Sequence, residues 1–219
     1  MSYLLRHSDI RIQAEGAWLD ALLSHAPDVR GLILCARPDP QPLRASAVDQ
    51  AAQVFHEAGF ATLLLNLLTP LEAEREPDLR FNIPQLMARL QAVLDWAWHQ
   101  PGLEGVPAGL MATDTVAAAA IRLLAREPDT AFALVSHCGR ADLAGGEPLR
   151  QLRCPLLMLD TADAPASARA AWACLGGERL WQDIAASRET AVGATATDAA
   201  MRVACDWFVR HLPVAEVAP

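Results

Sequence analysis

The feature that most restricts the fold of this chain is the alternation of short apolar runs with longer amphipathic stretches. Runs of strand length lie at residues 31–36, 61–66, 108–112, 131–136, 155–160 and 179–184. Stretches of helix length lie at about 46–58, 83–99, 116–126 and 197–212. Strands that alternate with helices form a largely parallel sheet that helices cover on both faces. We therefore expect one α/β domain over residues 1–219, with no large lid domain.

Three segments lie outside this alternation. Residues 10–14 and 17–23 flank a Glu-Gly pair and predict a β-hairpin. Residues 72–80 are rich in charge and residues 139–146 are rich in glycine, so we expect both to be loops. In a parallel sheet, ligands bind at the carboxyl ends of the strands. The candidate site residues are therefore those that follow the apolar runs.

The composition narrows the chemistry further. All 18 basic residues are arginine, and the net charge is −8. Without lysine, the chain cannot form a Schiff base, hold pyridoxal phosphate or complete a Walker phosphate loop. An acidic chain argues against a nucleic-acid or membrane partner, because both need a basic patch. The five cysteines are scattered and odd in number, a pattern typical of a reduced compartment, so we expect a cytoplasmic protein without disulfides or a zinc site.

Four segments carry a resemblance to a known family. They are EAGFATLLLNLLTP (57–70), RFNIP (80–84), SHCGRADLAG (136–145) and DWFVRHL (206–212). They resemble the small dienelactone-hydrolase-like branch of the α/β-hydrolases, and the order of elements agrees over nearly the whole chain. The resemblance implies an α/β-hydrolase fold with a mostly parallel central sheet. It also implies a catalytic triad of Ser or Cys, His and an acidic residue.

The catalytic positions of that family are not filled in the usual way. The resemblance places the nucleophile at Asp114, in the sequence ATDTV (112–116), where the family has Ser or Cys between two glycines. It places the acid at Asp163 and the histidine near Glu189, and no histidine follows until the final helix. The Gly-rich oxyanion loop is replaced by CARP (35–38). Because each triad member depends on the others, we do not expect ordinary serine-triad hydrolysis.

We interpret the chain as an α/β-hydrolase-fold pseudoenzyme with a degenerate triad and a binding, regulatory or scaffold role. The expected pocket at the strand ends is lined by Cys35, Arg37, Asp114, His137 and Arg140. Arg37 and Arg140 could bind a carboxylate or another small-molecule ligand by two-pronged hydrogen bonds. Alternatively, either arginine could neutralise Asp114 or Asp163. We expect no cofactor and no metal, and we regard a homo-oligomer as compatible with a scaffold role.

Other interpretations of the same residues stay open. Asp114 or Cys35 could act as the nucleophile of a hydrolase of esters, lactones or related carbon–heteroatom bonds, with His137 as substitute base. This alternative depends on His137, because the other histidines lie away from the predicted strand ends. Asp114, Asp160 and Asp163 could instead form a carboxylate cluster for a divalent cation.

Overall fold

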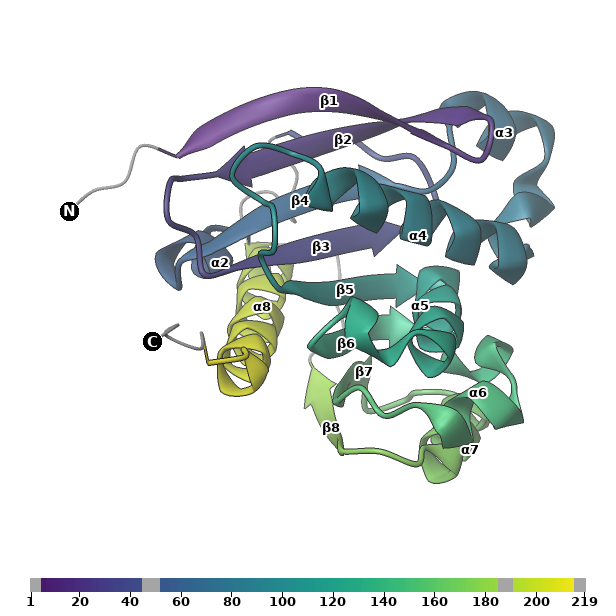
Figure 1. Ribbon diagram of the computed structural model, residues 1–219. Coiled ribbons are helices and arrows are strands. Elements are labelled where there is room, and N and C mark those ends of the chain that lie inside the picture. The colour runs from purple at the N-terminus through teal and green to yellow at the C-terminus, as the bar shows by residue number, and fades with distance from the viewer. Residues whose placement is uncertain (1–4, 45–51, 185–190, 215–219) are drawn as a thin grey trace.

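The computed structural model describes residues 5–44, 52–184 and 191–214. Within these residues, eight strands form one sheet in the order β1-β2-β4-β3-β5-β6-β7-β8 (Figure 1). Their bounds are β1 (Arg6–Ala14), β2 (Ala17–His25), β3 (Gly31–Arg37), β4 (Phe60–Asn66), β5 (Ala108–Asp114), β6 (Ala133–Gly139), β7 (Leu156–Thr161) and β8 (Arg179–Ile184). Strand β1 pairs antiparallel with β2, and β2 pairs antiparallel with β4. The other neighbouring strands, from β4 through β3 to β8, pair in parallel.

Helices cover both faces of the sheet, as the alternation predicts. The described α-helices are α2 (Gln53–Glu57), α3 (Pro70–Arg75), α4 (Ile83–Trp98), α5 (Thr115–Arg126), α6 (Gly146–Gln151), α7 (Ala166–Cys174) and α8 (Ala191–His211). Short 3-10 turns lie at η1 (Pro77–Phe81), η2 (Pro128–Thr130) and η3 (Ala141–Ala144). The buried residues form two clusters, one on each face of the sheet. Helices α4, α5, α6 and α7 contribute to one cluster, and α2 and α8 contribute to the other. None of the described helices combines the length and the apolarity that crossing a bilayer requires.

Small residues let the helices approach the sheet closely. The inner face of α5 is largely alanine, and it is fully buried. On the other face, a Cβ placed on Gly109 of β5 would lie 2.8 Å from the Phe208 ring of α8. A larger residue at position 109 would therefore push α8 away from the strands that carry the candidate site.

A buried ion pair fixes the segment that follows β4. The Arg89 side chain, on α4, is only 1% exposed and pairs with Glu72 on α3. Its Nη1 also donates to the Leu67 carbonyl at 2.7 Å. Hydrogen bonding to Arg89 lowers the pKa of Glu72 to about 2. Glu72 also closes a capping box with Thr69 at the start of α3. The Arg89–Glu72 pair thus holds α3 against α4 and sets the course of the chain into η1.

The structure corrects four of the sequence expectations. Residues 72–80 are not a loop, because α3 and η1 occupy them, and residues 139–146 contain η3 and the start of α6. The hairpin strands are longer than predicted, and α8 begins at Ala191 rather than near residue 197. The first part of the helix expected at 46–58 lies outside the described residues; its last part is α2. The remaining strands and the helices α4 and α5 are confirmed within a few residues.

Candidate functional site

The turn from β5 into α5 keeps a strained backbone with aspartate at its apex. Asp114 has φ 49° and ψ −133°, a conformation that residues other than glycine rarely adopt. Its carbonyl accepts a hydrogen bond from the Arg140 main-chain N–H at 2.9 Å. The neighbouring strand comes close as well: a Cβ on Gly139 would lie 2.5 Å from the Ala117 Cβ. This strained turn, which we call the elbow, therefore persists although aspartate and not serine occupies its apex.

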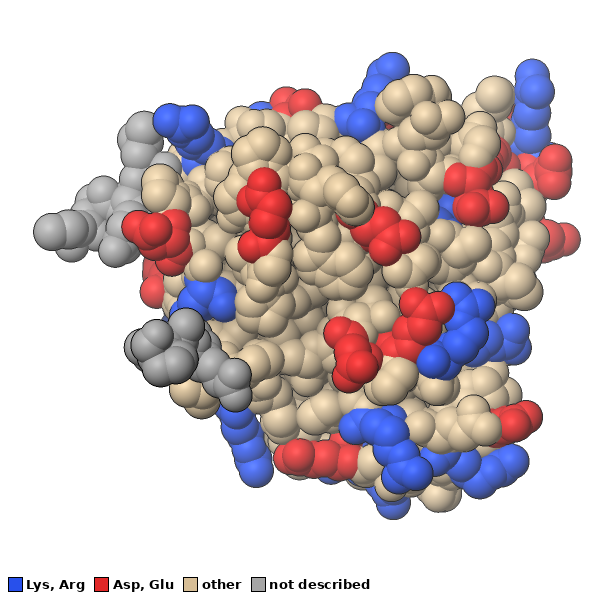
Figure 2. Space-filling view, in the orientation of Figure 1, with Lys and Arg blue, Asp and Glu red and all other residues tan. Residues whose placement is uncertain are grey.

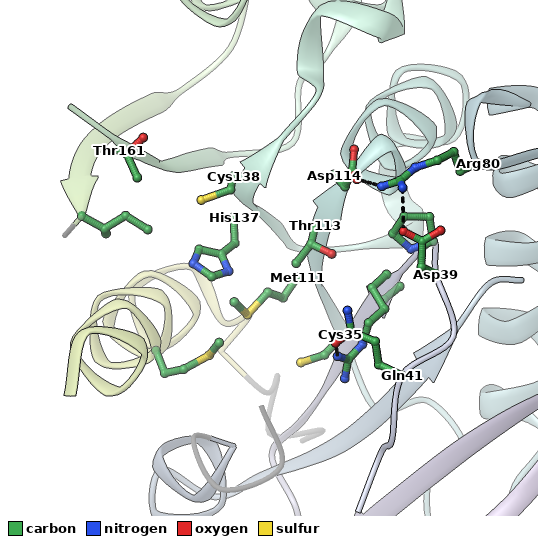
Figure 3. Close-up of a pocket in the computed structure, with 15 residues that line it drawn as sticks. Cys35, Asp39, Gln41, Arg80, Met111, Thr113, Asp114, His137, Cys138 and Thr161 are labelled. Atoms are coloured by element: carbon green, nitrogen blue, oxygen red, sulfur yellow. Dashed lines mark hydrogen bonds and ion pairs between the residues drawn. The ribbon is translucent and has the colours of Figure 1, made fainter. Parts of the chain in front are cut away.

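Arg80 engages the Asp114 carboxylate. Its Nη2 donates to Asp114 Oδ2, and its Nη1 pairs with Asp39 Oδ2 at 2.9 Å. Figure 3 shows the guanidinium between the two carboxylates, which come from the end of β5 and from the loop after β3. The three side chains are 32% to 37% exposed. Sequence reasoning missed this role of Arg80, because it assigned Arg80 to a charged loop and expected Arg37 or Arg140 beside Asp114.

A cavity of about 650 Å³ opens at the carboxyl ends of the central strands. It brings together four of the predicted site residues: Cys35, Arg37, Asp114 and His137. Its polar lining residues include Asp39, Gln41 and Arg80, and its apolar lining residues include Met111, Ile184 and Met201. The strand ends converge here because parallel strands finish at one edge of the sheet. The cavity thus lies where the sequence places the expected pocket, at the carboxyl ends of the strands.

His137 and Asp114 share this cavity but point in different directions. His137 lies on β6 in register with Thr113 of β5, and its ring is directed toward α8, whereas Asp114 is directed toward Arg80 (Figure 3). Cys35 lies on β3, so β5 stands between it and β6, a separation of two strands or roughly 10 Å. Among the described residues, the hydrogen bonds join His137 to neither Asp114 nor Cys35.

Burial sets the protonation of the candidate nucleophile and base. It raises the pKa of the Cys35 thiol to about 12, although Arg37 opposes the effect. Burial also lowers the pKa of His137 below its ordinary value of 6.5. At neutral pH, Cys35 is therefore a thiol and His137 is a neutral imidazole. A neutral imidazole could accept a proton, but a thiol with so high a pKa is a poor nucleophile.

Arg37 differs from the other cations at these strand ends. Its Nη1 donates to Gln41 Oε1 at 2.7 Å, and no carboxylate in the described part of the chain pairs with it. Partial burial lowers the pKa of Arg37, but a guanidinium keeps its charge at ordinary pH. Arg37 therefore presents N–H donors to the cavity, and none of the residues that the structure describes neutralises its charge.

The structure does not bring Arg140 or Asp163 into the cavity. Arg140 binds Asp142 through Nε and Nη2, both at 2.9 Å, which lowers the pKa of Asp142. Asp163 is exposed in the loop after β7, where a hydrogen bond from the Thr161 side chain lowers its pKa. Asp160 is nearly buried, and its burial raises its pKa. Glu189, the position matched to the family's histidine, lies outside the described residues.

The hypothesis of a cation site receives no support from the geometry. Among the residues that the structure describes, no three His, Cys, Asp or Glu side chains are grouped so that they could hold a metal ion. Asp114, which that hypothesis requires, is instead engaged by a guanidinium. The prediction that the chain uses no metal or cofactor stays a prediction.

Comparison with solved structures identifies the fold. Dienelactone hydrolase from Anabaena variabilis superimposes with a TM-score of 0.82 at 27% identity, covering 95% of this chain and 99% of that one. Est1E from Butyrivibrio proteoclasticus gives a TM-score of 0.71 at 11% identity, covering 93% of this chain and 98% of that one. A cold-adapted esterase from an Arctic intertidal metagenomic library gives 0.73 at 13% identity, covering 97% and 100%. The chain is therefore an α/β-hydrolase-fold protein. Within that fold it is similar to dienelactone hydrolase, as the sequence resemblance predicts.

Sequence comparison adds a second kind of relative. No family model matches the chain. A Mycobacterium tuberculosis protein named "Putative phosphoribosyl transferase", found in two strains, is 31% identical over 212 residues. The match covers 95% of this chain but 47% of that protein. The chain thus spans about half the length of the curated relatives it matches.

Proposed function

We propose that this protein binds a small carboxylate-bearing molecule in the strand-end cavity and does not hydrolyse it. The observation that carries the proposal is the engagement of Asp114 by Arg80, which also holds Asp39. A carboxylate nucleophile must approach a substrate carbon, and its ester must then be released by a base-activated water. Here the carboxylate is held by a guanidinium, and the ring of His137 is directed elsewhere.

Arg37 supplies the binding half of the proposal. Its guanidinium faces a cavity whose remaining wall includes Met111, Ile184 and Met201. A planar guanidinium with free donors fits a carboxylate in a two-pronged geometry. Asp39 and Asp114 do not compete for Arg37, because both pair with Arg80. The preferred ligand therefore combines a carboxylate, which binds Arg37, with an apolar body that packs against Met111 and Met201.

The surroundings of the site support a small ligand in a reduced compartment. On the face shown in Figure 2, acidic and arginine side chains are interspersed, without the broad basic area that a nucleic acid would need. All five cysteines are free, which supports a cytoplasmic location. The activity named for the M. tuberculosis relatives can reside in the part of those proteins that this chain does not match.

The test separates binding from turnover. We would measure binding of a panel of aryl and alkyl carboxylates, and of their neutral amides, by calorimetry. The expected result is binding of acids but not amides, lost in Arg37→Met and kept in Arg126→Met, a matched change at an exposed arginine that pairs with Glu127. Equal binding of acids and amides would contradict the role of Arg37. Turnover of aryl esters or lactones that disappears in Asp114→Ala would overturn the non-catalytic assignment.

A hydrolase is the second candidate, because Asp114, Cys35 and His137 all line one cavity and the elbow keeps its strained backbone. It requires the His137 ring to turn toward Asp114 or Cys35 when substrate binds. Ester turnover that is lost in His137→Gln, and in either Asp114→Asn or Cys35→Ser, would establish it. Absence of turnover in the unmodified chain over the same substrates would exclude ester and lactone hydrolysis.

A further inference from the structure

The last strand of the sheet, β8, has an open edge. It pairs with β7 on one side and ends the sheet of the described residues, and Figure 1 shows no other described strand beside it. Four of its six residues are exposed and the other two are partly exposed. An open edge presents unpaired main-chain N–H and C=O groups, which are a template for another strand.

The pairing with β7 determines which residues present those groups. The N–H of Leu156, on β7, donates to the carbonyl of Glu178 at 3.0 Å. Main-chain groups alternate in direction along a strand, so Leu180 and Gln182 also turn theirs toward β7. Arg179, Trp181 and Asp183 therefore turn their N–H and C=O groups to the open edge.

This alternation restricts how two copies of β8 can pair. In an antiparallel pair, residues whose main-chain groups face the partner must lie opposite one another. When Trp181 lies opposite Trp181 of a second copy, Arg179 lies opposite Asp183 at both ends. Sliding by two residues in either direction places Arg179 or Asp183 opposite Trp181, and sliding by four places like charges together. One register alone joins opposite charges and uses all three outward-facing residues.

We propose that two copies of this chain associate through antiparallel pairing of their β8 edges, centred on Trp181. Each of the three opposed residue pairs exchanges two main-chain hydrogen bonds, and the two sheets become continuous. Cross-strand opposite charges and aromatic pairs each stabilise such pairing by about 0.2–1 kcal/mol. This interface is independent of the proposed ligand, and it gives a defined form to the homo-oligomer that the sequence analysis regards as compatible with a scaffold role.

The side chains on β8 are already ordered for this contact. The Trp181 ring packs edge-to-face on Trp172 of α7, with centroids 5.8 Å apart, and Arg169 lies 5.2 Å from its centroid. The Trp181 indole N–H donates to Asp183 Oδ1 at 2.9 Å. Side chains that are ordered before association lose less conformational entropy on binding. The Gln182 amide donates to the outward carbonyl of Asp183 at 3.1 Å and, being exposed, can turn aside when the partner strand arrives.

The opposite edge of the sheet does not offer the same complementarity. On β1, Asp9 pairs with Arg44 at 2.8 Å and Arg11 pairs with Asp20 at 3.1 Å within the chain. On β8, neither Arg179 nor Asp183 forms an ion pair with another described residue. Arg179 donates to the Leu175 carbonyl and lies 5.2 Å from the Trp172 ring centroid, and Asp183 accepts from the Trp181 indole. These neutral partners leave the two charges of β8 without an opposite charge among the described residues, whereas the charges of β1 are paired within the chain.

Charge reversal tests both the strand and the register. We would measure the association of the full chain by sedimentation velocity over a wide concentration range. We expect a reversible dimer, with the dissociation constant raised about tenfold in Arg179→Asp and in Asp183→Arg, because each change places like charges opposite at both ends. An equimolar mixture of the two variants should dimerise like the unmodified chain, because an acidic edge then meets a basic one. The double variant Arg179→Asp/Asp183→Arg should also recover.

The controls make the outcome decisive. Arg11→Asp on β1 applies the same charge change to the other edge strand and should leave the dissociation constant unchanged. Circular dichroism melts verify that every variant is folded. An unmodified chain that remains monomeric at all concentrations would overturn the proposal. A dimer that is insensitive to both single reversals, or a mixture of folded variants that does not re-associate, would overturn it as well.

Discussion

The pair of Arg89 and Glu72 allows a quantitative prediction, because one partner is buried and the other is partly exposed. Replacing Arg89 by methionine keeps most of the side-chain volume but removes the guanidinium that contacts Glu72 and the Leu67 carbonyl. The pKa of Glu72, lowered from 4.5 to about 2, corresponds to roughly 3 kcal/mol at neutral pH. Glu72 is 24% exposed, so in the variant water still solvates part of the Glu72 charge. We therefore reduce the expected loss of stability from this pair to about 2 kcal/mol.

The lost hydrogen bond to Leu67 adds about 1 kcal/mol. We therefore expect Arg89→Met to lower the free energy of unfolding by roughly 3 kcal/mol at pH 7. A carboxyl group whose folded pKa is lowered stabilises the fold above its unfolded pKa, and this stabilisation is lost as the pH falls through the folded pKa. For Glu72 the window runs from pH 4.5 down to about 2. The difference between the unmodified chain and Arg89→Met should shrink by roughly 1 kcal/mol at pH 3.

The assay is urea unfolding at pH 7 and pH 3, followed by far-ultraviolet circular dichroism. Glu72→Gln and the double variant Arg89→Met/Glu72→Gln complete a double-mutant cycle. Because Glu72→Gln leaves Arg89 buried without its partner, the double variant should lose less stability than the two single changes added together. The reasoning is refuted if Arg89→Met costs less than about 1 kcal/mol at pH 7, or if its cost is the same at both pH values.

Three further predictions follow from packing and burial. Gly109→Ala should destabilise the fold by about 1–3 kcal/mol, because its Cβ would lie 2.8 Å from Phe208; an unchanged thermal midpoint would contradict the close contact of α8 with the sheet. His137 should titrate below pH 6.5 in an NMR experiment, because burial disfavours its charged form, and a midpoint at or above that value would contradict this. Cys35, with a pKa of about 12, should react with iodoacetamide at pH 8 more slowly than the partly exposed Cys174. Equal rates by mass spectrometry would show an accessible, activated thiol at Cys35.

The fold could be predicted from the sequence wherever apolar periodicity alone decides the structure. The buried strands and the helices α4 and α5 have this property, because each buries a continuous face. The error at α3 has a different origin. Charge density indicated a loop, but Thr69, followed by Pro70 and three residues on by Glu72, is the pattern of a capping box with proline at the first helical position. That local signal identifies the start of α3, whereas charge density alone does not.

The candidate site could be predicted in part, for a topological reason. Cys35, Arg37 and Asp114 lie at the carboxyl ends of parallel strands. Because parallel strands end at one edge of the sheet, no further information is needed to predict that these residues meet in one cavity. The partner of Asp114 could not be found in this way. Arg80 lies 34 residues from it, and the two meet because α3 and η1 fold back over the strand ends. For Arg140, a carboxylate two residues along the chain is the nearer partner.

The elbow at Asp114 has a consequence for protein engineering. Its backbone strain, of order 1–3 kcal/mol, is maintained by the packing of Gly139 against Ala117 and by the hydrogen bond from Arg140, and none of these contacts involves the side chain of residue 114. The conformation of the turn is thus determined by neighbouring residues and not by the side chain at position 114. A designer who grafts a reactive group at this position meets a turn that is already formed, and needs to redesign side chains but not the main chain.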